Sequence, residues 1–499
     1  MSVLNDVRDI LRGVFASFFG FGGRLIARAI LMIFAGRLFG VEALGHLGQV
    51  AALSEITAAI CAMGLKRGLL DMLSAEAVAG RPPERRIMEV LSLSLLISLI
   101  AGIVLGVIWW HVFSGNIALV LALALAVPAI TLTEVTVTAT KFKRIIRWDV
   151  LARCIAAPWT FLFAALIFWA LGFGGQSLLF AYVCSLLSGI IVLIFGISNL
   201  FTWRALITSS PTLASWKIIV KKCLPIAITD IGIIALRRIV IVILSIFVGP
   251  EGVGLYYMAQ QVVTVPHKIG GMFEPMLSPV IASLHNKGKS SQIRDNLVSI
   301  CRWVFTVQLF LTVPLIIFAS PVMGIFGPEF VAGGLILSFI LLAELVDGTF
   351  LNVETAIVYA RPKIPPTLLI IALIIEVISI SVLSSIWGVE GAALGYLITM
   401  ASLTALRLIM LKKHLNMSIL SVQYLNPLAA GGIMAALMWI GTRIAPDIIV
   451  VKVAVIVLCL MAYVLYIKQF AITKSDRVLF RAITRKRKRA RREKSASTS

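Results

Sequence analysis

FGVEALG, at residues 39–45, decides the fold, because the chain repeats its pattern of a glycine followed two residues later by an acid. The other copies are VGPEGVG at 248–254, FGPEFVAGG at 326–334 and WGVEGAALG at 387–395. Each copy lies between two long apolar segments. Glycine allows a tight reversal of the chain, and an acid near the start of the next helix meets its free N–H groups. The repeated pattern therefore predicts a recurring turn between helices.

The composition indicates which solvent surrounds those helices. Hydrophobic residues make up 60% of the chain, charged residues 14%, and the mean hydropathy is +1.01. Such a chain is an integral membrane protein, since most of it cannot face water. Apolar segments of about 20 residues cross a hydrocarbon core of about 30 Å as helices. We predict fourteen spans, near 13–38, 44–65, 87–112, 117–140, 149–171, 177–200, 218–248, 253–283, 301–325, 332–359, 365–387, 391–412, 424–444 and 449–469.

The distribution of basic residues predicts the orientation of the chain. Lys and Arg collect in the loops that follow even-numbered spans, whereas the opposite loops contain almost none, with Arg443 as the exception. Short cytoplasmic loops are enriched in these residues, so both termini should be cytoplasmic. The formal net charge of +22 then reflects a membrane surface and requires no nucleic acid. The run RKRKRARREK at 485–494 is expected to lie against anionic membrane lipid.

The repeat also predicts the organisation of the chain. Aligning Gly40 with Gly249 superposes the first six spans on the next six, with both sets starting on the same side of the membrane. We therefore expect an all-α polytopic membrane protein with about fourteen transmembrane helices, in which two six-helix halves are related by a pseudo-twofold axis. The predicted regions are an N-terminal half at 1–210, a C-terminal half at 211–415, the extra helices 13 and 14 at 416–472, and a cytoplasmic polybasic tail at 473–499.

These features resemble a known family. The segments AGRLFGVEALGHLG at 35–48 and VGPEGVGLYYMAQQ at 248–261, with two six-helix halves and an extra helix pair, are similar to Wzx-type polysaccharide and O-antigen flippases. These belong to the multidrug/oligosaccharidyl-lipid/polysaccharide (MOP) exporter superfamily, and the lipid II flippase is a more distant resemblance. The resemblance implies translocation of undecaprenyl-diphosphate-linked oligosaccharide by alternating access across the bacterial cytoplasmic (inner) membrane. It also implies polysaccharide polymerase and export machinery as partners.

Five cations inside predicted spans are the candidates for substrate binding. They are Arg24, Arg28, Arg237, Arg238 and Lys268. A lipid-exposed cation costs at least ~2.5 kcal/mol, so such residues normally face a cavity, and a guanidinium matches the oxygens of a diphosphate. Arg28 and Arg237 each lie twelve residues before an aligned glycine, whereas the adjacent Arg237 and Arg238 cannot both face one way. The alternative is that these cations pair with intramembrane acids or reach the interface.

Four acids inside spans are candidates for ion coupling. They are Asp230, Glu55, Glu344 and Asp347. A buried carboxyl group can bind a proton, or sodium where other oxygens surround it. Glu344 and Asp347 share a helical face. The alternative is that these acids balance the charge of the arginines, and coupling to a proton, sodium or the membrane potential stays open.

The sequence indicates no enzyme. We find no catalytic motif, no metal-ligand spacing and no cofactor signature. The longest predicted loops, of about 20 residues, leave no room for a soluble catalytic domain, which a membrane glycosyltransferase or polymerase would need. The main alternative function is an ion-coupled multidrug exporter of the same superfamily, for which twelve spans and an acid-rich cavity are typical.

Overall fold

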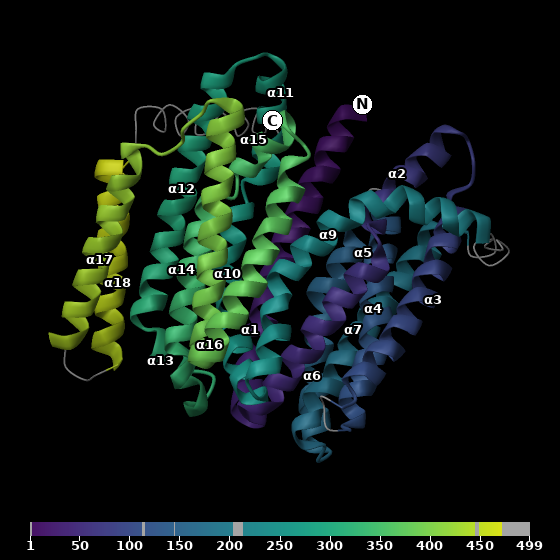
Figure 1. Cartoon of the computed structure of the whole chain (residues 1–499), viewed down its shortest axis with the longest axis horizontal. Coiled ribbons are helices and arrows are strands. Elements are labelled where there is room, and N and C mark those ends of the chain that lie inside the picture. Colours follow the sequence, from purple (N-terminus) through teal and green to yellow (C-terminus); the bar gives the residue numbers. More distant parts are fainter. Residues whose placement is uncertain (1, 112–114, 144, 203–212, 445–448, 472–499) are drawn as a thin grey trace, which may run out of the picture. The chain divides into compact units, whose positions relative to one another are not determined.

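A computed structural model of the chain describes residues 2–111, 115–143, 145–202, 213–444 and 449–471, and within them every regular element is a helix (Figure 1). The chain divides into two compact units. Unit 1 comprises Met1–Val263, Ala319–Ala343 and Lys363–Leu403, and unit 2 comprises Thr264–Phe318, Glu344–Pro362 and Thr404–Ser499. Helices α10, α14 and α16 contribute residues to both units.

The elements that begin in unit 1 are α1 (Ser2–Ala62), α2 (Leu65–Val78), α3 (Pro83–Trp109), α4 (Ile117–Phe142), α5 (Arg147–Val150), the π-helical turn η1 (Leu151–Ala156), α6 (Ala157–Ala170), the 3₁₀ turn η2 (Gly174–Gln176), α7 (Ser177–Leu200), α9 (Leu213–Phe247), α10 (Pro250–Gly271), α13 (Ala319–Gly324), the 3₁₀ turn η3 (Pro328–Gly333), α14 (Gly334–Phe350) and α16 (Ile364–Leu415). Those that begin in unit 2 are α11 (Glu274–Asn286), α12 (Ser290–Ile317), α15 (Val353–Ala360), the 3₁₀ turn η4 (Val422–Tyr424), α17 (Leu425–Ile444), α18 (Ile449–Tyr466) and the π-helical turn η5 (Ile467–Ala471).

The four predicted turns interrupt helices at their glycines. Gly40 breaks α1 with φ 78°, and Gly388 breaks α16 with φ 59°. Gly327 has φ 150° between α13 and η3, and Gly249 separates α9 from α10. Since side chains with a Cβ rarely adopt the positive φ that three of these glycines have, the repeated glycine is a requirement of the backbone. The prediction of a recurring turn is confirmed.

Two copies of the turn contact each other reciprocally in unit 1. A Cβ on Gly45 would lie 2.6 Å from the carbonyl carbon of Pro250, and a Cβ on Gly254 would lie 2.9 Å from that of Val41. In the alignment of Gly40 with Gly249, Gly45 corresponds to Gly254 and Val41 corresponds to Pro250. Such an exchange of equivalent contacts is what a local twofold relation produces.

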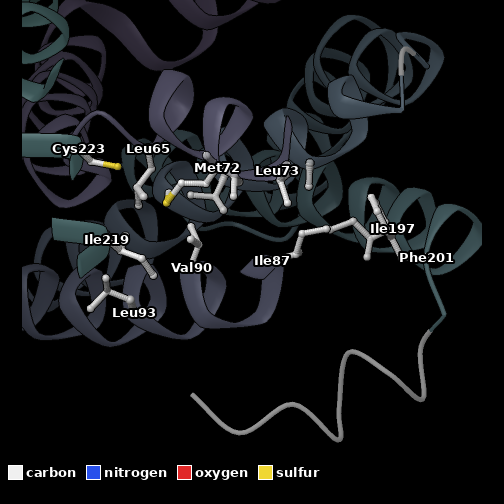
Figure 2. Close-up of a cluster of buried hydrophobic side chains, with 13 residues drawn as sticks. Leu65, Met72, Leu73, Ile87, Val90, Leu93, Ile197, Phe201, Ile219 and Cys223 are labelled. Carbon is white, nitrogen blue, oxygen red and sulfur yellow. The ribbon is translucent and has the colours of Figure 1, made fainter. Parts of the chain in front are cut away.

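A cluster of buried side chains holds the amphipathic helix α2 in unit 1 (Figure 2). Leu65, Leu69, Met72 and Leu73 recur at helical spacing on one face of α2 and are buried. They pack against residues of α3, α4, α7 and α9. The first turn of α2 also contains Lys66 and Arg67, so this packing fixes where these two cations lie.

Helices α17 and α18 form a hairpin in unit 2 that packs on α12 (Figure 1). Leu309, Met434 and Tyr463 belong to their common hydrophobic cluster. The buried Tyr463 hydroxyl donates to the Thr306 carbonyl oxygen over 2.8 Å. This pairing satisfies a polar group that would otherwise be buried alone.

The helix boundaries modify the predicted spans. The predicted span at 253–283 is two helices, α10 and α11, and the span at 332–359 is α14 followed by α15. In the described part of the chain, nine helices are long and apolar enough to cross a membrane. Helices α1, α9 and α10, which contain the predicted site cations, are not among them. An all-α membrane fold is confirmed, while the count of fourteen and the domain boundaries stay predictions; the polybasic run at 485–494 lies outside the described residues.

Candidate functional site

Unit 1 contains a cavity of about 530 Å³ lined by residues of α1, α2, α4, η1, α6, α7, α9 and α10. Much of its wall is apolar, with Leu31, Met32 and Ile234 among the lining residues. Nine charged side chains also line it: the bases Arg24, Arg28, Lys66, Arg67, Arg153 and Arg238, and the acids Glu55, Glu134 and Asp230. The cavity therefore has a formal excess of three positive charges.

Two adjacent glutamines of α10 hold two of the cavity arginines. The Arg28 guanidinium, from α1, donates to the Gln261 side-chain oxygen. Arg238, from α9, donates from Nη1 to the Gln260 side-chain oxygen over 3.0 Å. The segment before this Gln-Gln pair, GVGLYYMA at 252–259, is mostly apolar, so the pair is a polar end to about two apolar turns of helix.

Arg238 also forms a bidentate ion pair. Its Nε lies 2.7 Å from Glu55 Oε2 and its Nη2 lies 3.0 Å from Glu55 Oε1. Side-chain exposure is 20% for Arg238 and 32% for Glu55. The planar guanidinium and the carboxylate match in geometry, so each neutralises the other inside the cavity.

The other two acids of the cavity lie close to other cations. Glu134 Oε1 is 3.1 Å from Arg153 Nη1, and Glu134 Oε2 is 3.9 Å from Lys66 Nζ. Asp230 Oδ1 is 3.8 Å from Arg67 Nε. Each acid that lines the cavity therefore has a cation within ion-pair distance.

Arg24 and Arg28 differ from the other cavity cations. They are one helical turn apart on α1 and line the same cavity. Among the residues whose side chains the structure describes, none forms an ion pair or hydrogen bond with Arg24, and the partner of Arg28 is the neutral Gln261. Within this part of the chain, two guanidinium groups of the cavity thus form no ion pair.

Aromatic side chains complete the wall. Phe161, Tyr182 and Tyr257 line the cavity, and the rings of Phe161 and Tyr182 have their centroids 6.0 Å apart. Aromatic rings provide flat apolar surface with a polar edge in the case of tyrosine. The cavity can therefore bind a ligand with both apolar faces and anionic groups.

Four of the nine predicted site residues do not line the cavity. Arg237 is exposed and does not line the cavity, and its carbonyl oxygen accepts from Gln260 Nε2 over 3.1 Å. Neighbouring residues of a helix point about 100° apart, so Arg238, one position out of the alignment register, faces the cavity. Lys268 is exposed and belongs to unit 2. The remaining two are Glu344 and Asp347.

Glu344 and Asp347 belong to a buried polar cluster of unit 2. Glu344 Oε2 lies 2.6 Å from His267 Nδ1. Asp347 pairs with Arg407, whose Nη2 also lies 3.0 Å from Glu354 Oε2. Charge balance accounts for Asp347, as the alternative interpretation expected, and ion coupling by this cluster stays a prediction.

Two further arginines of these sites were predictable from the sequence. Arg153 and Arg407 lie inside the predicted spans at 149–171 and 391–412, where the same cost of a lipid-exposed cation applies. Arg153 lines the cavity and Arg407 joins the cluster of unit 2. Tyr182 and Tyr257 gave no such signal, because aromatic residues are common throughout membrane helices.

Comparisons with known proteins identify the family of this chain. The sequence profile of a family described as polysaccharide biosynthesis protein matches residues 33–330, more than half of the chain. The chain belongs to this polysaccharide biosynthesis family. No curated protein matches it in sequence.

Solved structures show the fold of this polysaccharide biosynthesis protein in other proteins. The lipid II flippase MurJ in an inward closed conformation is 14% identical, with a TM-score of 0.71 over 91% of this chain and 98% of that chain. An inward-facing multidrug resistance MATE family transporter of the MOP superfamily is 15% identical, with a TM-score of 0.58 over 79% of this chain and 94% of that chain. The chain therefore has the fold of this flippase and this transporter, as the resemblance in sequence predicted.

Proposed function

We propose that this polysaccharide biosynthesis protein is a flippase that translocates an undecaprenyl-diphosphate-linked oligosaccharide, an O-antigen or exopolysaccharide repeat unit, by alternating access. Its family is one of polysaccharide biosynthesis, and its fold occurs in a lipid II flippase and a multidrug transporter. These relatives are flippases and transporters, which fits movement of a molecule rather than bond chemistry.

The observation that carries the proposal is the pair of uncompensated cations on α1. A charge in a cavity with a largely apolar wall is costly unless a counter-charge is present. Arg24 and Arg28 line such a cavity, whereas each lining acid lies near another cation. Their charge therefore favours an anionic ligand.

A lipid diphosphate that is esterified at both ends has the matching chemistry. Each of its two phosphates keeps one ionised oxygen, so it brings two negative charges to the two free positive charges. Guanidinium groups donate in a planar fork that suits phosphate oxygens. The aromatic side chains Phe161, Tyr182 and Tyr257 would face the sugars, and the polyprenyl chain would stay in the lipid.

The alternative is an ion-coupled multidrug exporter. Similarity of fold alone fits either function, because one structural relative is a multidrug transporter. The cavity of this chain has six bases and three acids, and an excess of positive charge repels a cationic drug. The charge of the cavity therefore favours the flippase.

The cellular setting of the proposal follows from the same sequence features. The flippase would lie in the bacterial cytoplasmic (inner) membrane with both termini in the cytoplasm, as the basic loops predict. Its tail would contact anionic lipid, and its product would pass to a polysaccharide polymerase and export machinery. Of the predicted phosphate ligands, Arg24, Arg28 and Arg238 line the cavity, whereas a role for Arg237 or Lys268 would need another conformation.

The experiment that tests the proposal measures lipid-linked glycan in cells that lack this chain. The cells are complemented with wild type, with Arg24→Ala plus Arg28→Ala, or with Arg37→Ala, a matched control on an exposed position of α1. We expect the glycan to accumulate on the cytoplasmic leaflet and to be cleared by wild type and by the control, but not by the double variant. Unchanged amounts and sidedness of lipid-linked glycan in cells without the chain would refute the proposal.

A further inference from the structure

Glu55 is placed to control the charge of the phosphate site. It lines the cavity and holds Arg238 through two hydrogen bonds of 2.7 and 3.0 Å. Glu55, Arg24 and Arg238 also lie close enough to Arg28 to interact with it electrostatically, as does the Tyr257 hydroxyl group. Arg24, Arg28, Arg238 and Glu55 therefore form one electrostatic site, which we call the phosphate site.

The charge of that site can be counted from its members. Arg24, Arg28 and Arg238 contribute three positive charges and Glu55 contributes one negative charge, which leaves +2. The other charged residues of the cavity pair among themselves, with Glu134 near Arg153 and Lys66 and Asp230 near Arg67, and they account for the remaining +1 of the cavity. Without the carboxylate of Glu55 the same site would have a charge of +3.

Two lipid diphosphates differ by one charge. A diphosphate esterified to both a polyprenyl chain and a glycan has two ionised oxygens. A diphosphate esterified to the lipid alone has a terminal phosphate with a second ionisation near pKa ~6, so it has about three negative charges at pH 8. A site with a charge of +2 balances the two charges of the glycan-bearing diphosphate. The diphosphate esterified to the lipid alone would keep one negative charge without compensation beside Glu55.

We propose that Glu55 makes the cavity select the glycan-bearing diphosphate diester over the bare lipid diphosphate, by fixing the charge of the phosphate site at +2. This inference rests on the proposed function. It assigns Glu55 a role in specificity, since the group acts by repelling a third phosphate charge. A flippase with this filter would not carry the unloaded lipid back through the same cavity.

The test compares the affinities of two probes for the purified full-length protein in detergent at pH 8. The probes are farnesyl diphosphate and farnesyl-diphosphate-linked N-acetylglucosamine. We expect wild type to bind the linked sugar more tightly. Glu55→Gln should shift the ratio of the two affinities about tenfold or more toward farnesyl diphosphate, because it removes the like-charge repulsion.

Three further variants separate charge from structure. Glu55→Gln plus Arg238→Gln returns the site to +2 without leaving a charge unpaired, so the ratio should return toward that of wild type even if the single variant folds poorly. Glu55→Asp keeps the charge and should keep the ratio. Glu42→Gln, the matched control, removes an exposed acid of α1 that does not line the cavity and should leave the ratio unchanged.

The outcomes distinguish this inference from the proposed function. If wild type binds neither probe, the phosphate site and the proposed function both fail. If wild type binds both probes but Glu55→Gln does not shift the affinity ratio toward farnesyl diphosphate, the selectivity role of Glu55 is wrong while the phosphate site stands. If the single variant does not fold, the same conclusion follows when the double variant does not return the ratio toward that of wild type. A wild-type preference for farnesyl diphosphate would also overturn the inference.

Discussion

The closest approach between two copies of the repeated turn predicts a specific sensitivity at Gly45. A Cβ added there would lie 2.6 Å from the carbonyl carbon of Pro250 and 3.1 Å from its Cα. Carbon atoms in favourable contact are about 3.5–4.0 Å apart, so Gly45→Ala requires the two turns to separate by roughly 1 Å. The obstructing atoms belong to the backbone and cannot rotate away.

The cost of this substitution follows from overpacking. Extra carbon atoms in a tightly packed site cost about 1–3 kcal/mol, and a backbone obstruction places Gly45→Ala at the upper end of that range. Gly432, on α17, is the matched control because a Cβ there meets no atom within 4 Å. Gly432→Ala should be neutral or stabilising by about 0.5–1 kcal/mol, since alanine favours a helix interior over glycine.

The assay is thermal unfolding of the purified protein in detergent, followed with a dye that becomes fluorescent on reaction with thiols. The free and buried cysteines Cys61, Cys223 and Cys301 become accessible on unfolding. We expect Gly45→Ala to lower the midpoint temperature and Gly432→Ala to keep or raise it. Equal midpoints for the two variants would show that the turns do not pack backbone against backbone.

Three further perturbations test other contacts by the same unfolding assay. Arg407→Ala should destabilise the protein by about 3–5 kcal/mol, because it leaves two carboxylates of unit 2 without their partner; a midpoint equal to that of wild type would show that the pair is dispensable. Leu73→Ala should cost about 2–5 kcal/mol by opening a cavity in the cluster of Figure 2, whereas Val78→Ala, on a position of the same helix that is 91% exposed, should change little; similar losses for both would contradict the assigned burial. Tyr463→Phe should cost about 0.6 kcal/mol, the average for a hydrogen bond between membrane helices, and a loss of several kcal/mol would mean that the hydroxyl group has a larger role.

The turns between helices were predictable from the sequence, because their backbone conformation favours glycine. A glycine between two apolar segments, with an acid two residues on, has few uses other than a reversal between helices, and the four copies do interrupt helices. The spans at 253–283 and 332–359 were less predictable, because apolar segments continue on both sides of each junction, and the Gly270–Gly271 pair and Asn352 at the junctions do not by themselves require a helix to end. Hydropathy measures solvent preference and does not report such a break.

The candidate site was predictable in membership but less so in geometry. Arg24, Arg28, Glu55 and Asp230 were found because a charge inside a membrane span needs a cavity or a partner, and the structure brings all four to one cavity. The choice between Arg237 and its neighbour was not predictable. It depends on the rotation of α9 about its axis, which packing against the other helices determines.

Pairing was the least predictable property. Each acid had several cations at similar depth, and only the folded chain shows that Glu55 pairs with Arg238 and Asp230 lies near Arg67. These pairings leave the α1 arginines without an acid. That difference, rather than the number of basic residues, gives the cavity its expected preference for a diphosphate.

Translocation in reconstituted vesicles tests directly whether Arg24 and Arg28 bind the lipid diphosphate during transport. A fluorescent polyprenyl-diphosphate-linked disaccharide is placed in vesicles that contain wild type, Arg24→Ala plus Arg28→Ala, or Arg37→Ala, and the fraction that crosses the bilayer is followed by quenching from outside. We expect wild type and Arg37→Ala to move the lipid, while the double variant moves it no faster than protein-free vesicles do. A double variant that transports at the wild-type rate would contradict the claim that the α1 arginines bind the lipid diphosphate.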